Sequence, residues 1–126
     1  MANTNMITLM SWGHKYGNPP ANFKFDVSYF KNPWREKEIK NCQDKSERKK
    51  KIIEFMKNQE GVETIIVHIS EVIAFYSLLF PDEHICVAIC CSAGEFRSPA
   101  IVELIGKELS KRKIKYDINH SKESLI

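Results

Sequence analysis

The sequence has no long uninterrupted apolar run. Its apolar stretches fall short of the roughly 18 residues that a membrane-spanning helix needs, so we expect no association with a membrane. Residues 1–5 also lack the cationic segment followed by an apolar one that marks a secretory signal peptide. A cytoplasmic protein is the resulting expectation.

Cysteine is scarce and is not spaced for a scaffold. Of the four cysteines, Cys86, Cys90 and Cys91 crowd one apolar segment, where neighbouring residues of a strand would point to opposite faces. A disulfide framework is therefore not expected, and a reducing compartment is favoured. The sequence contains no Cys-x-x-Cys pair and no His/Cys ligand spacing that would predict a zinc site. We therefore expect neither a metal nor a cofactor.

Neither sign of charge dominates the chain. Nineteen Lys and Arg residues oppose 16 Asp and Glu residues, which leaves a formal net charge of +3. This mildly basic balance suits an anionic ligand but does not by itself indicate nucleic acid. A length of 126 residues, with 43% hydrophobic and 28% charged residues, predicts one domain over residues 1–126 with a core of its own.

Apolar spacing predicts elements in the order β-β-α-α-β-α-β. Strands are expected at 6–12, 23–29, 85–90 and 113–120, and helices at 44–59, at 62–80 with His68 at or near the core, and from Pro99 after a Ser98 cap. This order predicts an α/β fold, a three-layer sandwich with a mostly parallel sheet of about four strands. In such sheets ligands bind at the carboxyl ends of the strands.

Two loops are expected at that edge of the sheet. The loop Cys91–Arg97 leads from the third strand into the last helix, so its N–H groups and the positive end of the helix dipole point the same way. That arrangement receives anions, and a phosphate is the first ligand to suspect. The loop Gly13–Pro20 follows the first strand and places His14, Lys15 and Tyr16 between two glycines, where the backbone can approach a ligand. Taken alone, its glycines and prolines indicate only a turn.

The pattern Cys91-x5-Arg97-Ser98 resembles the signature loop of cysteine-dependent tyrosine phosphatases. By that resemblance Cys91 would be the nucleophile, Arg97 would hold the phosphate oxygens and Ser98 would help the thiolate leave. Asp26 or Asp82 would be the acid, although neither lies in an obvious acid loop. This resemblance rests on one motif.

Three ordered motifs cover more of the chain. They are S-W-G-H-K-Y-G-N-P at 11–19, F-D-V-S-Y-F-K-N-P at 25–33 and V-A-I-C-C-S-A-G-E-F-R-S at 87–98, followed by N-H-S at 119–121. From about residue 6 to 125 the chain resembles the C-terminal domain of the RapZ family, which also contains C-x5-R-S. That family includes a bacterial RNA-binding adaptor that senses an amino-sugar phosphate. The resemblance implies self-association as a homodimer or homotetramer, and the chain would be a stand-alone domain without the family's N-terminal P-loop domain.

The chain departs from the family pattern at charged positions. The family's arginine after F-D-V is Ser28 here, and its basic residue and histidine in the late loop are Glu95 and Phe96. The two arginines that flank His120 in the family are also replaced. Four or five groups able to bind phosphate or RNA are therefore missing.

The groups that remain favour a flatter, less charged ligand. Lys15 and Arg97 are kept, and a base or nucleoside could stack on Phe96 or Tyr16. Glu95 could accept a hydrogen bond from a ribose hydroxyl or an exocyclic amine.

We therefore expect a binding module for a phosphorylated small ligand, a nucleotide-like or sugar-phosphate signal, which could act by sequestering it. The candidate ligand-binding residues are Gly13, His14, Lys15, Tyr16, Gly17, Asp26, Cys91, Ser92, Ala93, Gly94, Glu95, Phe96, Arg97, Ser98 and His120. The second hypothesis is an RNA-binding adaptor, with Lys49, Lys50, Lys111 and Lys113 as phosphate contacts. Such cations are more often a solvated helix face. The cysteine-dependent phosphatase ranks third.

Overall fold

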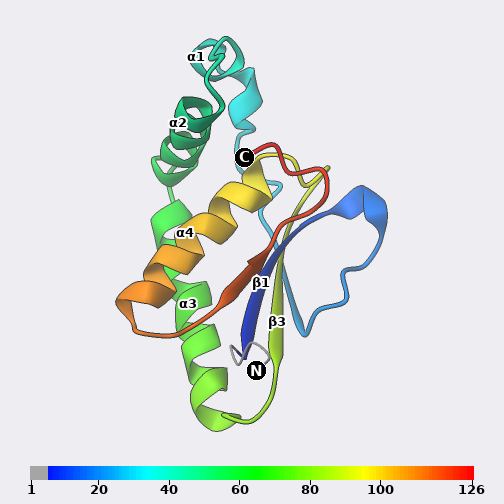
Figure 1. Cartoon of the computed structure of the whole chain (residues 1–126), viewed down its shortest axis with the longest axis vertical. Coiled ribbons are helices and arrows are strands. Elements are labelled where there is room, and N and C mark those ends of the chain that lie inside the picture. The colour runs from blue at the N-terminus through cyan, green and yellow to red at the C-terminus, as the bar shows by residue number, and fades with distance from the viewer. Residues whose placement is uncertain (1–5) are drawn as a thin grey trace.

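Four parallel strands form one sheet in the order β2-β3-β1-β4 (Figure 1). The computed structural model describes residues 6–126, so the residues used above to exclude a signal peptide lie outside it. The strands are β1 (Ile7–Gly13), β2 (Phe23–Asp26), β3 (Ile85–Cys91) and β4 (Asp117–Asn119). The helices are α1 (Lys37–Lys40), α2 (Lys45–Lys57), α3 (Val62–Leu79) and α4 (Arg97–Lys111), with 3-10 turns η1 (His14–Tyr16) and η2 (Pro33–Arg35). The predicted α/β class and the parallel sheet of four strands are confirmed.

The strand order decides which face of the sheet each connection covers. The connections β2 to β3 and β3 to β4 cross the sheet in the same direction, so right-handed crossovers place α2, α3 and α4 on one face. The connection β1 to β2 crosses in the opposite direction and covers the other face, where Trp12 and Ala21 pack on the sheet. The layer on this second face of the sheet, which completes the predicted three-layer sandwich, is therefore formed by a loop rather than by helices.

Both central strands are buried on both faces. Odd-numbered residues of β1 and β3, such as Leu9, Val87 and Ile89, join Ile101 and Ile105 of α4 in the main core. The even-numbered residues on the other face, Met10, Ala88 and Cys90, form a second buried cluster. This explains why residues 85–91 are almost continuously apolar. All four cysteines are free.

Two strands are shorter than the sequence predicted. β2 ends at Asp26 because Oδ1 of Asp26 accepts hydrogen bonds from the N–H of Ser28 at 2.9 Å and from its hydroxyl at 2.6 Å, which turns the chain. β4 covers only three residues and follows a turn in which Lys113 has a φ of 60°.

The predicted Ser98 cap is wrong. α4 begins at Arg97 after Phe96, and Ser98 lies inside the first turn. Its hydroxyl is fully buried and donates to the carbonyl oxygen of Trp12 at 3.4 Å. Ser98 therefore ties the start of α4 to the end of β1.

α3 corrects two expectations about the apolar segments. By length and composition it could cross a membrane, although no membrane-length run was expected. Its residues Ile66, Ile69 and Ile73 are buried in the main core, and 28% of this span is buried inside the molecule. His68, expected near the core, is exposed, and its Nδ1 lies 3.5 Å from Oε1 of Glu71.

Candidate functional site

The two predicted loops lie against each other at the carboxyl ends of β1 and β3. The N–H of Lys15 donates to the carbonyl oxygen of Ser92 at 3.2 Å. A Cβ atom on Gly13 would lie 2.6 Å from the carbonyl carbon of Ala93, so the two backbones leave no room for a side chain. Gly94 has a φ of 73°, and a Cβ there would lie 2.9 Å from the nitrogen of Gly13. The junction of the loops therefore depends on glycine at both positions.

The topology explains why a site forms here. β1 and β3 are neighbours, and their outgoing connections leave toward opposite faces of the sheet. Neighbouring strands of this kind open a crevice at their carboxyl ends, the usual ligand position in open α/β sheets.

The loop before α4 contains several unused hydrogen-bond donors. Within residues 6–126, no hydrogen bond uses the backbone N–H groups of Ala93, Gly94, Glu95 or Phe96. They stand at the N-terminus of a 15-residue helix, where the dipole favours negative charge. Buried N–H groups rarely stay unpaired, so this segment is suited to an anion.

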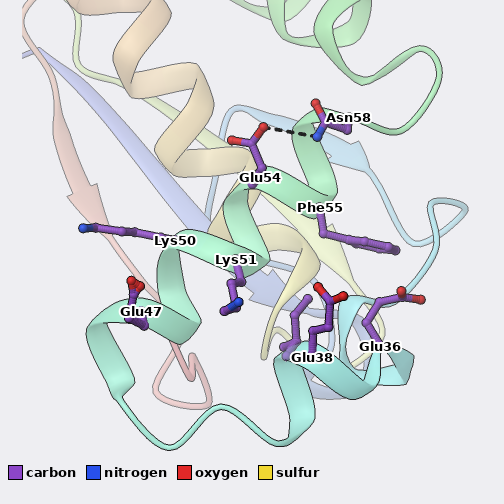
Figure 2. Close-up of a pocket in the computed structure, with 9 residues that line it drawn as sticks. Glu36, Glu38, Glu47, Lys50, Lys51, Glu54, Phe55 and Asn58 are labelled. Carbon is purple, nitrogen blue, oxygen red and sulfur yellow. Dashed lines mark hydrogen bonds between the residues drawn. The ribbon is translucent and has the colours of Figure 1, made fainter.

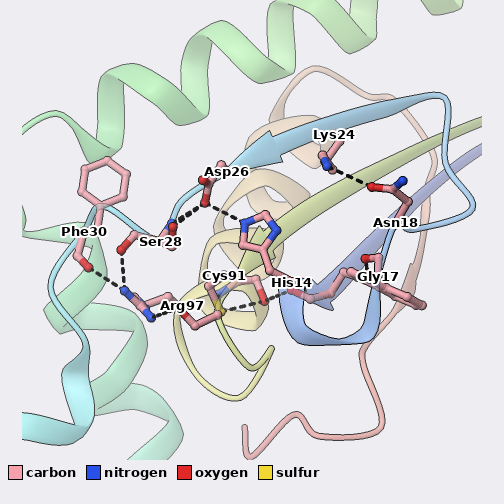
Figure 3. A network of polar contacts seen from close by, with 12 residues as sticks. His14, Gly17, Asn18, Lys24, Asp26, Ser28, Phe30, Cys91 and Arg97 are labelled. Atoms are coloured by element: carbon pink, nitrogen blue, oxygen red, sulfur yellow. Dashed lines mark hydrogen bonds and ion pairs between the residues drawn. The ribbon is translucent and has the colours of Figure 1, made fainter.

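Arg97 is engaged with backbone oxygens rather than with a carboxylate (Figure 3). Its Nη1 donates to the carbonyl oxygens of Ser28 at 2.5 Å and Phe30 at 3.1 Å, and its Nη2 donates to Oγ of Ser92 at 3.3 Å. Arg97 thus fixes the turn after β2 to the start of α4. Its Nε makes no hydrogen bond within the part of the chain that the structure describes.

His14 and Asp26 meet across the end of β3 (Figure 3). Nε2 of His14 lies 3.1 Å from Oδ1 of Asp26, and both side chains are about one third exposed. Burial raises the pKa of Asp26, but hydrogen bonds from Ser28 and His14 outweigh it and lower the pKa to about 2. The carboxylate is therefore charged, and it orients the imidazole of His14.

Cys91 and Phe96 lie inside the protein. Cys91 is 2% exposed, and its Sγ donates to Oγ of Ser98 at 3.3 Å and accepts from the N–H of Ser98 at 3.4 Å. Phe96 is 5% exposed and stacks on Trp34, with ring centres 5.0 Å apart. In this structure the Phe96 ring is not open to a ligand, in contrast to the stacking role expected for it, whereas Tyr16 is 46% exposed.

A cavity of about 360 Å³ lies beside the loops, at the ends of β1 and β4. Trp12 and Tyr16 supply aromatic rings to its lining, His120 and Ser121 supply polar groups, and Lys122 and Glu123 supply one cation and one carboxylate. A Cβ on Gly94 would lie 3.1 Å from Oγ of Ser121, so the wall of the cavity touches the loop 93–96 before α4.

A chain of hydrogen bonds holds His120 at this cavity. Nδ1 of His120 lies 3.0 Å from Oγ of the buried Ser11, and Nε2 lies 2.8 Å from Oε2 of Glu103. The hydrogen bond from His120 lowers the pKa of Glu103, against the effect of burial. The N–H of Ser121 also donates to Oγ of Ser11, at 2.9 Å, so the chain anchors the C-terminal segment to β1.

Sequence reasoning missed several lining and positioning residues. Ser11 and Trp12 stood inside the first motif but were taken only as family markers. Lys122 belonged to no motif or spacing that would have marked it as a ligand-binding residue. Glu103 lies on α4 and approaches His120 only through the tertiary fold.

The four predicted RNA contacts have different surroundings in the structure. Lys49 acts electrostatically on Glu103 of α4. The next residue, Lys50, lines a groove of about 460 Å³ between α1 and α2 (Figure 2). The acidic residues of that groove are Glu36, Glu38, Glu47 and Glu54. Lys111 lies 4.0 Å from Glu108, and Lys113 stands in the turn after α4.

The sequence is similar to one protein family and to several curated proteins. Residues 5–124 match the family described as the RapZ C-terminal domain. A protein of Thermosipho africanus, named nucleotide-binding protein, is 34% identical over 102 residues, which are 78% of this chain and 36% of that protein. A protein of Fervidobacterium nodosum with the same name is 32% identical over 121 residues, or 93% of this chain and 42% of that protein. The chain thus spans about two fifths of the length of the curated relatives it matches.

Proposed function

Because the chain belongs to the family of the RapZ C-terminal domain, we propose that it binds a phosphorylated small ligand, of the nucleotide or sugar-phosphate kind. Its site would be the carboxyl edge of β1, β3 and β4. The name of the two relatives, nucleotide-binding protein, supports the same ligand class. Because this chain spans only part of each relative, the proposal rests mainly on the site itself.

One observation carries the proposal: the cavity between β1 and β4 borders a loop whose N–H groups at 93–96 have no hydrogen-bond partner in the described part of the chain. Ser121 lines the cavity and lies against Gly94 of the loop. A ligand in the cavity would therefore reach the donors at 93–96 with an acidic group, and the helix dipole of α4 would favour that group as an anion.

The rest of the ligand would lie on the aromatic wall. The indole N–H of Trp12 donates to the carbonyl oxygen of Gly17 at 2.8 Å, which fixes the ring, and Tyr16 leaves nearly half its surface in solvent. Nζ of Lys15 lies 5.3 Å from the centre of the Tyr16 ring. An aromatic surface with a cation beside it suits a phosphorylated base or sugar.

The site supports binding rather than phosphoryl transfer. A thiol that attacks phosphorus must be exposed to its substrate, but Cys91 is 2% exposed. We expect no hydrolysis of an aryl phosphate. Hydrolysis that Cys91→Ser abolishes would restore the phosphatase hypothesis.

Calorimetric titration tests the proposal directly. The probes are adenosine and guanosine mono-, di- and triphosphates and a hexosamine 6-phosphate, each with its unphosphorylated counterpart. We expect at least one phosphorylated probe to bind, its counterpart to bind at least about tenfold more weakly, and Tyr16→Ala to weaken binding about tenfold. Tyr29→Ala is the matched control because Tyr29 is 90% exposed outside the cavity. Equal binding by the Tyr16 variant and the wild type would exclude this cavity.

A second candidate, an RNA adaptor, is favoured by one cluster of cations. Lys57, Lys107 and Lys111, together with Glu63 and Glu108, line a groove of about 140 Å³ between α2, α3 and α4. If RNA phosphates bind there, Lys107→Glu with Lys111→Glu should weaken RNA binding and flatten its salt dependence, whereas Lys37→Glu on α1 should not. Indifference to all three changes would leave these lysines as a solvated helix face.

A further inference from the structure

Two adjoining grooves lie along α2. The first, of about 460 Å³, lies between α1 and α2 (Figure 2). The second, of about 540 Å³, lies between the end of α2 and the segment 29–31 that follows β2. Phe55 and Asn58 of α2 line both of them, so the two grooves form one continuous surface, which we call the α2 groove.

Apolar side chains form the centre of the α2 groove. Phe30 and Phe55 are half-buried there, and Ile39 of α1 is buried in its floor. Tyr29 is 90% exposed, the largest exposed fraction of any large hydrophobic side chain within residues 6–126. Exposed aromatic residues beside an apolar groove are typical anchors of protein interfaces.

The segment that carries Tyr29 is held in place from two sides. Nε2 of Gln59 donates to the carbonyl oxygen of Lys31 at 2.9 Å, and Oε1 of Gln59 accepts from the N–H of Lys31 at 2.8 Å. Arg97 donates to the carbonyl oxygens of the residues on either side of Tyr29. The Tyr29 ring is therefore exposed on a fixed backbone, and a surface that is already ordered loses little freedom on binding.

Carboxylates surround these rings. Five glutamates and three lysines line the α2 groove, so it is acidic, although the chain as a whole carries a net charge of +3. All eight of these side chains are exposed, and within residues 6–126 none of the five carboxylates forms an ion pair. The glutamates are Glu36, Glu38, Glu47, Glu54 and Glu60, and the lysines are Lys31, Lys50 and Lys51. A partner with an excess of cations would complement this surface.

We propose that the α2 groove binds a short basic segment of another protein, in which Lys and Arg residues flank one bulky apolar side chain. The apolar side chain would lie against Tyr29 and Phe55, and the cations would face the glutamates. Segments of this kind bind through a few apolar anchors, while charge selects the partner and speeds its association. Because the apolar area of the groove is small, we expect a dissociation constant of about 10–100 μM.

The charges of the groove favour a basic protein segment over other large partners. RNA and an anionic lipid surface both present phosphates, which the excess of carboxylates would repel. The α2 groove also shares no lining residue with the cavity between β1 and β4. The test of peptide binding and the test of ligand binding can therefore fail separately.

Selection of random peptides displayed on phage, with the purified chain as the immobilised target, tests the proposal. We expect the enriched peptides to carry at least about three Lys or Arg residues around one aromatic or aliphatic residue. The most enriched peptide is then synthesised with a fluorescein label, and its affinity is measured by fluorescence anisotropy. Because charge contributes to the contact, binding should weaken by roughly tenfold between about 50 and 300 mM salt.

Two variants separate the contribution of charge from that of the apolar anchor. Glu36→Lys with Glu54→Lys reverses two exposed charges of the groove and should weaken peptide binding by at least about tenfold. Tyr29→Ala removes the exposed ring and should weaken it by about tenfold. Glu71→Lys with Glu83→Lys is the matched control, because it makes the same change of charge at exposed residues outside the groove.

Any of three results would overturn the assignment. The first is a selection that enriches no basic peptides. The second is peptide binding that the Glu36 and Glu54 variant leaves unchanged. The third is equal binding by a peptide in which serine replaces the apolar residue, which would reduce the contact to unspecific attraction between charges. Binding of a single-stranded RNA that Tyr29→Ala abolishes would assign the groove to RNA instead.

Discussion

The two edges of the sheet present different chemical groups, polar at one edge and apolar at the other. At the carboxyl edge, two backbones touch at Gly13 and Gly94, four N–H groups have no partner among residues 6–126, and polar side chains form hydrogen-bonded chains. At the amino edge, the end of α3 leaves apolar rings and methyl groups in solvent. The first edge thus presents polar groups, and the second presents apolar area.

The parallel sheet explains this difference. All four strands end at the same edge, and α4, which follows β3, begins there with its positive dipole end. α3 runs back against the strands, so its C-terminal end emerges at the other edge. The proposed anion would bind at the first edge, whereas the second edge offers apolar surface. Each prediction below changes one edge and asks whether the other edge or the fold as a whole responds.

Gly13→Ala should have the largest effect. Its Cβ would lie 2.6 Å from the carbonyl carbon of Ala93, so the loops must separate, at a cost of about 2–4 kcal/mol in the free energy of unfolding, with loss of ligand binding. Gly61→Ala is the control, because nothing lies within 4 Å of its Cβ and only the strain of a left-handed backbone with φ 87° and ψ −14° remains, about 1 kcal/mol. Urea denaturation measures both changes. Equal costs would show that the loop junction does not hold this edge together.

The close contact of Gly13 with Ala93 illustrates what the sequence could and could not predict. The parallel sheet, the helices α2 and α3 and the two loops at one edge follow from apolar spacing and from glycine and proline positions. The contact between Gly13 and Ala93 does not follow from them, because it depends on how the ends of β1 and β3 pack. Sequence could place Gly13 in a loop but could not say why only glycine fits.

The errors in prediction also have physical causes. β2 was predicted too long because Phe23 to Tyr29 alternates, whereas the side chain of Asp26 bonds to Ser28 and ends the strand. Phe96 was assigned to the ligand because its role was judged from the loop alone, and its partner Trp34 lies 62 residues earlier. Side chains that meet through the tertiary fold leave no local pattern.

Ser11→Ala should loosen the carboxyl edge with a smaller loss. The change leaves the N–H of Ser121 and Nδ1 of His120 without their partner, at a cost of about 1–2 kcal/mol. Hydrogen exchange at Ser121 should accelerate. Ser110→Ala, which removes an exposed hydroxyl 3.3 Å from the Tyr116 hydroxyl, should cost less than about 0.5 kcal/mol. Unchanged exchange at Ser121 would contradict the proposed anchoring of the C-terminal segment.

Acid should weaken the same edge through Asp26. Its pKa falls from 3.8 to about 2 in the folded protein, so its contribution is complete above the unfolded value and is lost as pH falls toward 2. Asp26 is partly exposed, and after screening we expect about 1 kcal/mol. Asp26→Asn should remove this part of the acid dependence between those two pH values, while Asp82→Asn should leave it in place. An acid profile that Asp26→Asn does not change would contradict the pairing with Ser28 and His14.

The smallest change in the free energy of unfolding is expected at the amino edge, and it distinguishes the two edges most clearly. Leu78 is 77% exposed, so Leu78→Lys removes little buried apolar area from the monomer. Its free energy of unfolding should stay within about 0.5 kcal/mol of the wild type, and phosphorylated ligands should bind unchanged. Urea denaturation and calorimetric titration of the same variant measure both. A loss of several kcal/mol would mean that the end of α3 holds the fold together, because a side chain that the fold leaves in solvent contributes little to the stability of the folded chain.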